Sequence, residues 1–262
     1  MKSTLKSNKS SIHQIIKSMK KLVLSSIFMF ALTCSSVFSQ NAAQILLGID
    51  NNLNAAKDQS ISTTITIIDK AGKQSSREMT LIQKGSDKRL VKFLSPADQK
   101  GIGFLSLPGD NLTLYLPAFG KTRKIASSVK NTKFAGTDYS YEDMEAKKYS
   151  DKWTPKFLKT EGGNNVLELT PKSGTVTDYS KLVMYARSAD NYPVKIEHFD
   201  KSGKLVKILN ASNIQKVGKY QIAKETVLAD VKNGTKTKML ITNVKFDTGL
   251  TDDKFTEREL MK

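Results

Sequence analysis

Turn-forming residues recur at short intervals along almost the whole chain, and this rhythm restricts the fold more than any other feature of the sequence. The turn signals are Ala71-Gly72, Gly85-Ser86-Asp87, Pro108-Gly109-Asp110-Asn111, Gly162-Gly163-Asn164-Asn165, Lys201-Ser202-Gly203 and Asn233-Gly234. Each lies between runs rich in β-branched and aromatic residues, which is typical of successive antiparallel hairpins. The sequence therefore predicts roughly ten or eleven strands joined mostly by tight turns.

Hydrophobic spacing distinguishes one helix from the strands that follow it. Apolar side chains fall at helical spacing between residues 42 and 56, namely Ile45, Leu46, Ile49, Leu53 and Ala56. Between residues 60 and 69, Ile61, Ile65 and Ile67 share one face of a strand, while Ser and Thr occupy the other. We therefore predict a mainly β fold, in which a large curved antiparallel sheet has one helix over part of its concave face.

The first 39 residues have the composition of an export signal rather than of a folded domain. From Met19 the chain continues with Lys20 and Lys21, an apolar run over residues 22–32 and small residues up to Ser39. The apolar run is short for a membrane span, and no later segment approaches the roughly 20 apolar residues that a transmembrane helix needs. We predict that residues 1–39 are a signal peptide, with Met19 as an alternative start, and that residues 40–262 form one periplasmic domain.

Few residues are suited to catalysis or metal binding. The one cysteine, Cys34, falls in the predicted signal peptide, and a form lipid-anchored through it is the less favoured alternative. Without it the chain has no thiol for a disulfide, a metal site or a nucleophile. His13 leaves with the signal peptide, whereas His198 shares a strand face with Val194 and Ile196, so we expect a structural histidine rather than a general base. The sequence thus predicts no enzyme, no metal site and no cofactor.

The predicted mature chain is basic. Residues 40–262 hold 36 Lys and Arg against 25 Asp and Glu, a net charge of +11. The lysines are dispersed and the protein is exported, which argues against nucleic acid as a partner. Two interpretations remain. The positive charge could steer the protein towards an anionic membrane surface or an acidic partner, or it could simply form a solvated basic surface. Glu142, Asp143 and Glu145 are expected to form a solvated acidic edge.

The stretch from residue 112 to residue 144 combines an apolar strand, a turn, cations and aromatic side chains. Pro117 must end the strand or mark an edge, because proline cannot donate to a sheet ladder, and Gly120 permits a sharp turn. Cations project from the rim that follows, at Lys121, Arg123 and Lys124. Beyond them, apolar residues gather around Gly136: Phe134, Tyr139, Tyr141 and Met144. This apolar loop either plugs one end of the sheet or forms a lid over an apolar cavity.

Four segments resemble the outer-membrane lipoprotein-sorting family, the relatives of the periplasmic carrier LolA. They are VKFLSPADQKGIGFLSL (residues 91–107), NLTLYLPAFGKTRKI (residues 111–125), FAGTDYSYEDM (residues 134–144) and LTDDKFTERELMK (residues 250–262). The resemblance covers most of residues 43–262. It implies an incomplete β-barrel closed by helices or loops, an apolar interior that takes acyl chains, and no catalysis.

The resulting hypothesis is a periplasmic carrier or chaperone that binds acylated lipoproteins or other envelope lipids for transfer towards the outer membrane. Its partners would be an inner-membrane transporter, an outer-membrane acceptor and an anionic membrane surface. The alternative is a non-catalytic sensor or accessory module of an envelope lipid transporter. Candidates for the lipid cavity, each also suited to ordinary core packing, are Phe93, Leu105, Leu114, Leu116, Phe134, Trp153, Leu169, Met184 and Ile196. Candidates for the lid and rim are Pro117, Phe119, Gly120, Lys121, Arg123, Lys124, Gly136, Tyr139, Tyr141 and Met144.

Overall fold

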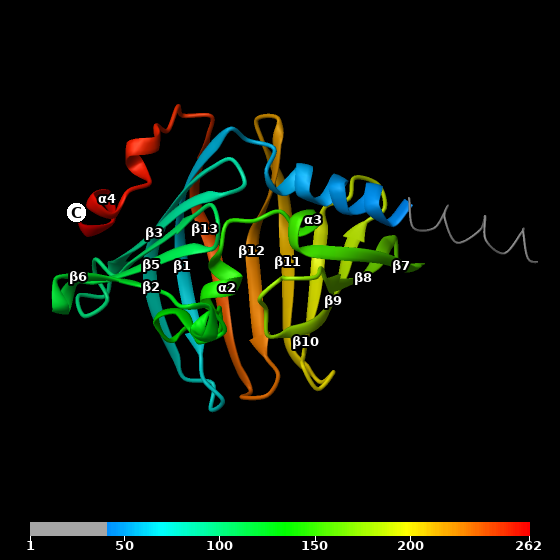
Figure 1. The fold of residues 1–262 in the computed structure, drawn as a ribbon, viewed down its shortest axis with the longest axis horizontal. Coiled ribbons are helices and arrows are strands. Elements are labelled where there is room, and N and C mark those ends of the chain that lie inside the picture. Colours follow the sequence, from blue (N-terminus) through cyan, green and yellow to red (C-terminus); the bar gives the residue numbers. More distant parts are fainter. Residues whose placement is uncertain (1–40) are drawn as a thin grey trace, which may run out of the picture.

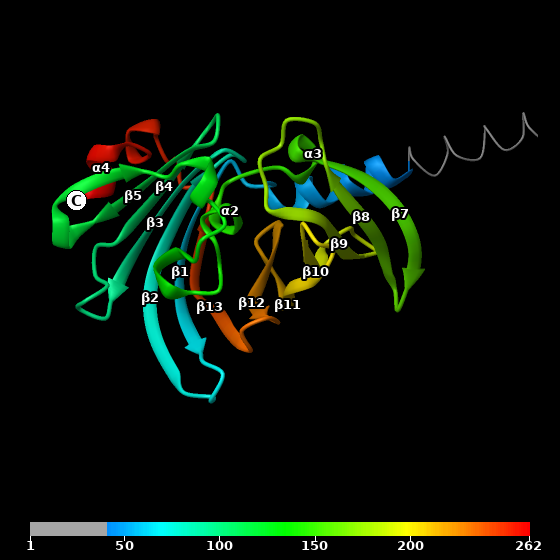
Figure 2. The same ribbon diagram turned by 60° about the horizontal axis from the view of Figure 1, so that its bottom comes forward.

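The computed structural model describes residues 41–262, in which 13 strands form one antiparallel sheet (Figure 1). The strands are β1 (Asp58–Ile68), β2 (Gln74–Lys84), β3 (Lys88–Ser95), β4 (Gly103–Leu107), β5 (Asn111–Leu116), β6 (Lys121–Lys124), β7 (Trp153–Glu161), β8 (Asn164–Pro171), β9 (Tyr179–Arg187), β10 (Pro193–Asp200), β11 (Leu205–Val217), β12 (Tyr220–Asp230) and β13 (Thr235–Phe246). The sheet is strongly curved and does not close into a barrel, which confirms the predicted fold class (Figure 2). The predicted signal peptide, with Met19 and Cys34, lies outside the described residues.

The strand order explains why one segment must cross the sheet. The order is β6-β5-β4-β3-β2-β1-β13-β12-β11-β10-β9-β8-β7, so strands consecutive in sequence are neighbours in the sheet, except for β6 and β7. The first and last strands, β1 and β13, pair with each other in the middle. The consecutive strands β6 and β7 form the two opposite edges. The chain between them, residues 125–152, therefore passes from one edge to the other across the concave face (Figures 1 and 2).

All the turns predicted from sequence lie between consecutive strands of the sheet. The strand count exceeds the prediction because the β9–β10 and β11–β12 connections carry weaker turn signals. The connection after β11 is only Gly218-Lys219, where Gly218 adopts a positive φ of 62°. In β1 the side chains of Ile61 and Ile65 are buried, as their alternation predicts.

The N-terminal helix covers residues 41–53 and ends three residues earlier than predicted. The amide N–H of Asn54 donates to the carbonyl of Asp50, after which the chain turns into β1. Leu53 is consequently 36% exposed rather than part of the core. The buried side of the helix packs on the concave face over β7–β10, and its residues are Ala42, Ile45, Leu46 and Ile49.

The C-terminal segment covers the opposite, convex face. It contains the short helices η4 (Asp252–Lys254) and α4 (Glu257–Met261). Phe255 and Leu260 pack there on Leu90 and Leu105. A Cβ on Gly103 would lie 2.6 Å from the side chain of Leu260, so α4 needs a glycine at this point of β4. None of the helices found in residues 41–262 is long and apolar enough to cross a membrane.

Candidate functional site

Residues 125–152, called here the covering segment, lie over the part of the concave face that the N-terminal helix leaves open. The segment holds the short helices η2 (Ser127–Val129), η3 (Phe134–Gly136), α2 (Tyr141–Met144) and α3 (Tyr149–Lys152). Most of its apolar side chains, including Ile125, Phe134 and Met144, are buried against the sheet, whereas Val129 is exposed. The ring of Phe134 lies 5.5 Å from those of both Phe93 and Phe104, and 5.7 Å from that of Tyr141. Aromatic packing of this kind makes the covering segment part of the core beneath it.

Local sequence gives the covering segment its compact path. Ala135 and Gly136 both have positive φ values, 48° and 73°, which turn the chain directly after Phe134. Ser140 then begins α2 with a capping box, in which its side chain accepts from the N–H of Asp143 and the carboxylate of Asp143 accepts from the N–H of Ser140. The capping box satisfies backbone donors that a four-residue helix would otherwise leave unpaired.

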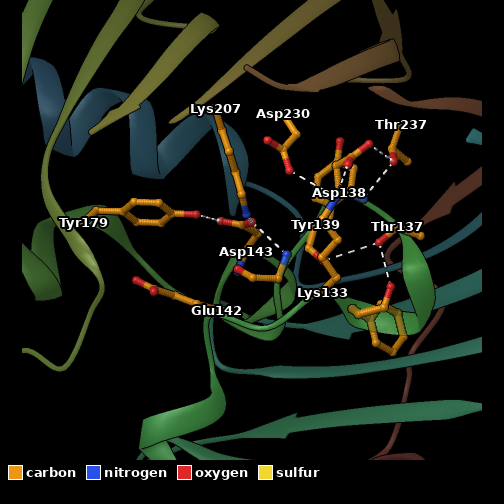
Figure 3. Close-up of polar contacts among 12 residues, drawn as sticks. Lys133, Thr137, Asp138, Tyr139, Glu142, Asp143, Tyr179, Lys207, Asp230 and Thr237 are labelled. Carbon is orange, nitrogen blue, oxygen red and sulfur yellow. Dashed lines mark hydrogen bonds and ion pairs between the residues drawn. The ribbon is translucent and has the colours of Figure 1, made fainter. Parts of the chain in front are cut away.

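Asp138 is one of the polar groups that attach the covering segment to the sheet (Figure 3). This carboxylate is 1% exposed and accepts from Thr237 Oγ1 at 2.8 Å and from Thr235 Oγ1 at 2.5 Å, both on β13. Lys133 Nζ lies 2.7 Å from it and 3.1 Å from Asp230 on β12. The pKa of Lys133 is raised, since its two carboxylate partners outweigh the effect of burial, which acts in the opposite direction.

Asp143 attaches the covering segment to the other half of the sheet. Its carboxylate lies 2.7 Å from Lys207 Nζ on β11 and accepts from the Tyr179 hydroxyl at 3.1 Å (Figure 3). Burial by itself would raise the pKa of Asp143, but Lys207 and the hydrogen bonds hold it well below its usual value. Charge-assisted contacts of this kind are among the stronger polar interactions in proteins.

Arg89 on β3 fixes the end of α2. Its guanidinium donates to the carbonyls of Met144 at 2.9 Å and Glu145 at 3.3 Å, and to Gln83 Oε1 at 2.6 Å. Burial lowers the pKa of Arg89 to about 10, so the side chain remains charged at neutral pH. Arg77 on β2 similarly donates to the carbonyl of Ala135. The sheet thus holds the covering segment by its backbone carbonyls as well as by its carboxylates.

A cavity of about 330 Å³ opens beside the covering segment. Its apolar lining comes from five strands and includes Ile61, Ile196, Leu209, Ile222 and Ile241. The covering segment contributes a polar part of the lining: Asp143, Glu145, Lys147 and Tyr149. A second cavity of about 50 Å³ shares Asp143, Lys147, Tyr149 and Leu209 with it and extends to Trp153 and His198. The two cavities therefore meet beneath residues 143–149 and could join if this part of the covering segment moved.

The structure divides the predicted cavity residues among several places. Ile196 lines the larger cavity and Trp153 the smaller one. Five others belong to the packed clusters of the concave face, and Leu116 packs against one of these clusters: Phe93, Leu114, Phe134, Leu169, Met184 and Leu116. Leu105 lies on the convex face beneath α4. Their contact with lipid stays a prediction, and for Phe93, Leu114 and Leu116 it requires that the covering segment be displaced.

The predicted lid and rim residues also separate into groups. Tyr139 and Met144 belong to the covering segment and are buried between it and the sheet, with Gly136 in its turn and Tyr141 packed on Phe134. Pro117, Phe119 and Gly120 form an exposed turn, η1 (Pro117–Phe119), between β5 and β6. Strand alternation separates the cations: Lys121 and Arg123 pair with Leu116 and Leu114 on the concave side. Lys124 points to the convex side and lies 2.9 Å from Glu257.

The prediction of a solvated acidic edge at residues 142–145 was wrong. Glu142 and Glu145 are each 5% exposed, and Asp143 is enclosed by Lys207 and Tyr179. Glu145 lies 2.8 Å from Lys152 Nζ. The spacing of Ser140 and Asp143, typical of a capping box, is the one sequence signal that could have assigned a structural role to this region.

His198 is buried against the ring of Tyr179, as expected for a structural histidine, and burial lowers its pKa to about 4.

An open antiparallel half-barrel whose concave face is covered by helices and by a segment linking its two edges defines the class of LolA-like proteins. A family model with the description "Uncharacterized protein" matches residues 85–262, a range that contains all four sequence motifs. No curated protein matches the chain at a significant level.

Solved structures give the same assignment. An outer membrane lipoprotein-sorting protein domain from Vibrio parahaemolyticus has a TM-score of 0.79 and 27% identity, covering 86% of this chain and 100% of its own. A DUF1329 family protein from Desulfovibrio piger has a TM-score of 0.80 and 25% identity, covering 85% and 99%. A LolA superfamily protein from Nitrosomonas europaea, at 19% identity and a TM-score of 0.71, covers 83% and 98% and shares the fold. The chain belongs to the family that the matching model describes, and its fold and sequence are similar to those of LolA-like outer-membrane lipoprotein-sorting proteins, which confirms the resemblance of its motifs.

Proposed function

We propose that the protein is a periplasmic, non-catalytic carrier that holds the acyl chains of a lipoprotein or another envelope lipid against its concave face. The observation that carries this proposal is the contrast between the two parts of the site. The concave face is broadly apolar, whereas the covering segment joins apolar contacts of Phe134, Tyr139 and Met144 to polar contacts of Asp138, Asp143 and Arg89. Acyl chains could replace the apolar contacts of the segment on this face, so that cargo and segment would compete for the same surface.

Energetics favour an exchange between cargo and covering segment. Each methylene buried from water contributes about 0.8 kcal/mol, so several acyl chains would bind too tightly to be released if they entered an empty cavity. Here the side chains of Phe134, Tyr139 and Met144 already occupy the apolar face. Acyl chains that displaced these side chains would gain only the difference between the two sets of contacts. A carrier that passes its cargo on requires this moderate net affinity. The cargo would come from an inner-membrane transporter and pass to an outer-membrane acceptor.

The direct test is native mass spectrometry of the protein purified from the cell envelope under mild conditions, followed by organic extraction. We expect a bound acyl species, and uptake of an added triacylated lipopeptide when the protein is isolated without one. A protein that is free of lipid and takes up neither lipid nor lipopeptide would contradict the carrier function.

A cavity-filling variant locates the binding site. Ala211 on β11 lines the larger cavity, whereas Ser212 is exposed on the other face of the same strand. Ala211→Phe should lower the affinity for a fluorescent acylated peptide roughly 10- to 60-fold, because it displaces two or three methylenes of the ligand. Ser212→Phe adds the same ring outside the cavity and should leave the affinity unchanged. Equal affinities for the two variants would place the acyl chains elsewhere.

The alternative function, a sensor or accessory module of a lipid transporter, is favoured by one observation. Most predicted cavity residues are packed into clusters, which leaves a cavity of about 330 Å³ in this conformation. A sensor needs only a rigid surface for its partner, whereas a carrier must expose these clusters. Lipid uptake therefore discriminates between the two functions.

A further inference from the structure

The turn between β5 and β6 exposes an aromatic side chain that the fold does not need. Phe119 is 72% exposed, more than any other large hydrophobic side chain in the described part of the chain. Pro117 begins the turn and Gly120 ends it with a φ of 60°, so these two residues account for its geometry. A solvent-exposed phenylalanine in a short turn contributes little to stability. The turn that holds it lies beside the edge strand β6, at one end of the molecule, where it is open to contact with another surface (Figure 1).

The charged residues near Phe119 in the sequence are of one sign. No Asp or Glu occurs between Asn111 and Thr137. Lys124, Lys130 and Lys133 in this stretch have carboxylate partners in Glu257, Asp110 and Asp138. Lys121 and Arg123 form no ion pair with any carboxylate of residues 41–262 and are exposed, both on the side to which Leu114 and Leu116 point.

We propose that Phe119, Lys121 and Arg123 form a docking surface for an anionic lipid bilayer. Aromatic rings enter the interface between head groups and acyl chains, while cations beside them contact lipid phosphates. The surface is one projecting turn, far smaller than the 20 to 30 residues per side, about 800 Å² per partner, of a standard protein interface. A projecting tip of this kind fits a fluid surface better than a folded partner. Because docking does not require an occupied concave face, it is separate from the proposed carrier function.

Binding of the purified protein to sedimented vesicles tests the surface. With vesicles of phosphatidylethanolamine and phosphatidylglycerol, Phe119→Ser should weaken binding about 10-fold, through the loss of aromatic burial. The double variant Lys121→Gln/Arg123→Gln should weaken it about 30-fold, since each cation near an anionic surface contributes roughly fivefold. The matched control is Lys201→Gln/Lys204→Gln, which removes the same charge from the exposed β10–β11 turn and should have little effect. If the control lost as much binding as the double variant, overall charge rather than this surface would explain membrane binding.

A tryptophan in the turn measures insertion directly. The natural Trp153 is 2% exposed but lines the smaller cavity, so the reporter is Phe119→Trp in a protein that also carries Trp153→Phe. We expect lipids brominated in their acyl chains to quench this double variant in anionic vesicles and not in vesicles of phosphatidylethanolamine alone. The proposal would be overturned if this quenching did not occur. It would also be overturned if Phe119→Ser lost no more vesicle binding than the control variant. Native mass spectrometry of Phe119→Ser should still find bound lipid, which separates a failure of docking from a failure of carriage.

Discussion

Replacing Arg89 with methionine is expected to destabilise the protein by about 3–5 kcal/mol and to loosen the end of α2. The guanidinium is the buried donor for the carbonyls of Met144 and Glu145 and for Gln83 Oε1. Methionine preserves much of the volume and leaves these acceptors without a partner, which costs their full desolvation. Urea unfolding would measure the loss of stability, and hydrogen exchange would show faster opening of the amides of residues 140–150.

Two further variants separate the role of Arg89 from that of any cation near the covering segment. Arg77→Met removes one donor, to the carbonyl of Ala135, at a half-buried site and should cost only about 1 kcal/mol. Arg89→Lys keeps the charge and should recover little, because an ammonium cannot reproduce the planar fork that reaches three acceptors. Full recovery of stability with lysine would show that charge alone holds this end of the segment. Unchanged hydrogen exchange at residues 140–150 in Arg89→Met would show that packing alone holds it.

Local sequence patterns predicted the sheet because strand and turn chemistry acts over a few residues. The alternation of isoleucines in β1 and the Gly-containing turns between strands are such patterns, and they also determine which side chains face inward. The same alternation assigns Lys121 and Arg123 to one side of β6 and Lys124 to the other. The prediction that all three act together disregarded this period of two, although the sequence already contained it.

The polar attachments of the covering segment could not be read from sequence because their partners are far apart in the chain. Asp143 meets Lys207, 64 residues later, and Asp138 meets Thr237, 99 residues later. These distances follow from the edge-to-edge crossing of residues 125–152, which depends on the pairing of β1 with β13. From the sequence alone, carboxylates in this connecting segment are therefore interpreted as solvated. Without the strand order, no residue on β11 or β13 could be assigned to it.

Lowering the pH from 7 to 5 is expected to reduce the free energy of unfolding, with about 2 kcal/mol of the change due to His198. Burial lowers the pKa of His198 to about 4 in the folded protein, against about 6.5 when unfolded, although Asp143 acts in the opposite direction. Between these values the unfolded chain binds a proton that the folded protein does not, so this contribution is present above pH 6.5 and is lost as the pH falls towards 4. Nδ1 of His198 meets no hydrogen-bond partner among the described residues, so no contact holds a proton there.

The variant His198→Phe isolates this contribution, because it keeps a ring against Tyr179 and removes the titrating group. Its unfolding free energy in urea should fall by about 2 kcal/mol less between pH 7 and pH 5 than that of the unmodified protein. Glu142 acts in the opposite direction over the lower part of this range, because burial raises its pKa, and it does so equally in both proteins. The pKa of Asp143 is lowered, so its carboxylate loses its contribution only at still lower pH. Equal pH dependence in the two proteins would mean that His198 takes up its proton in the folded state, with the covering segment admitting water to the smaller cavity.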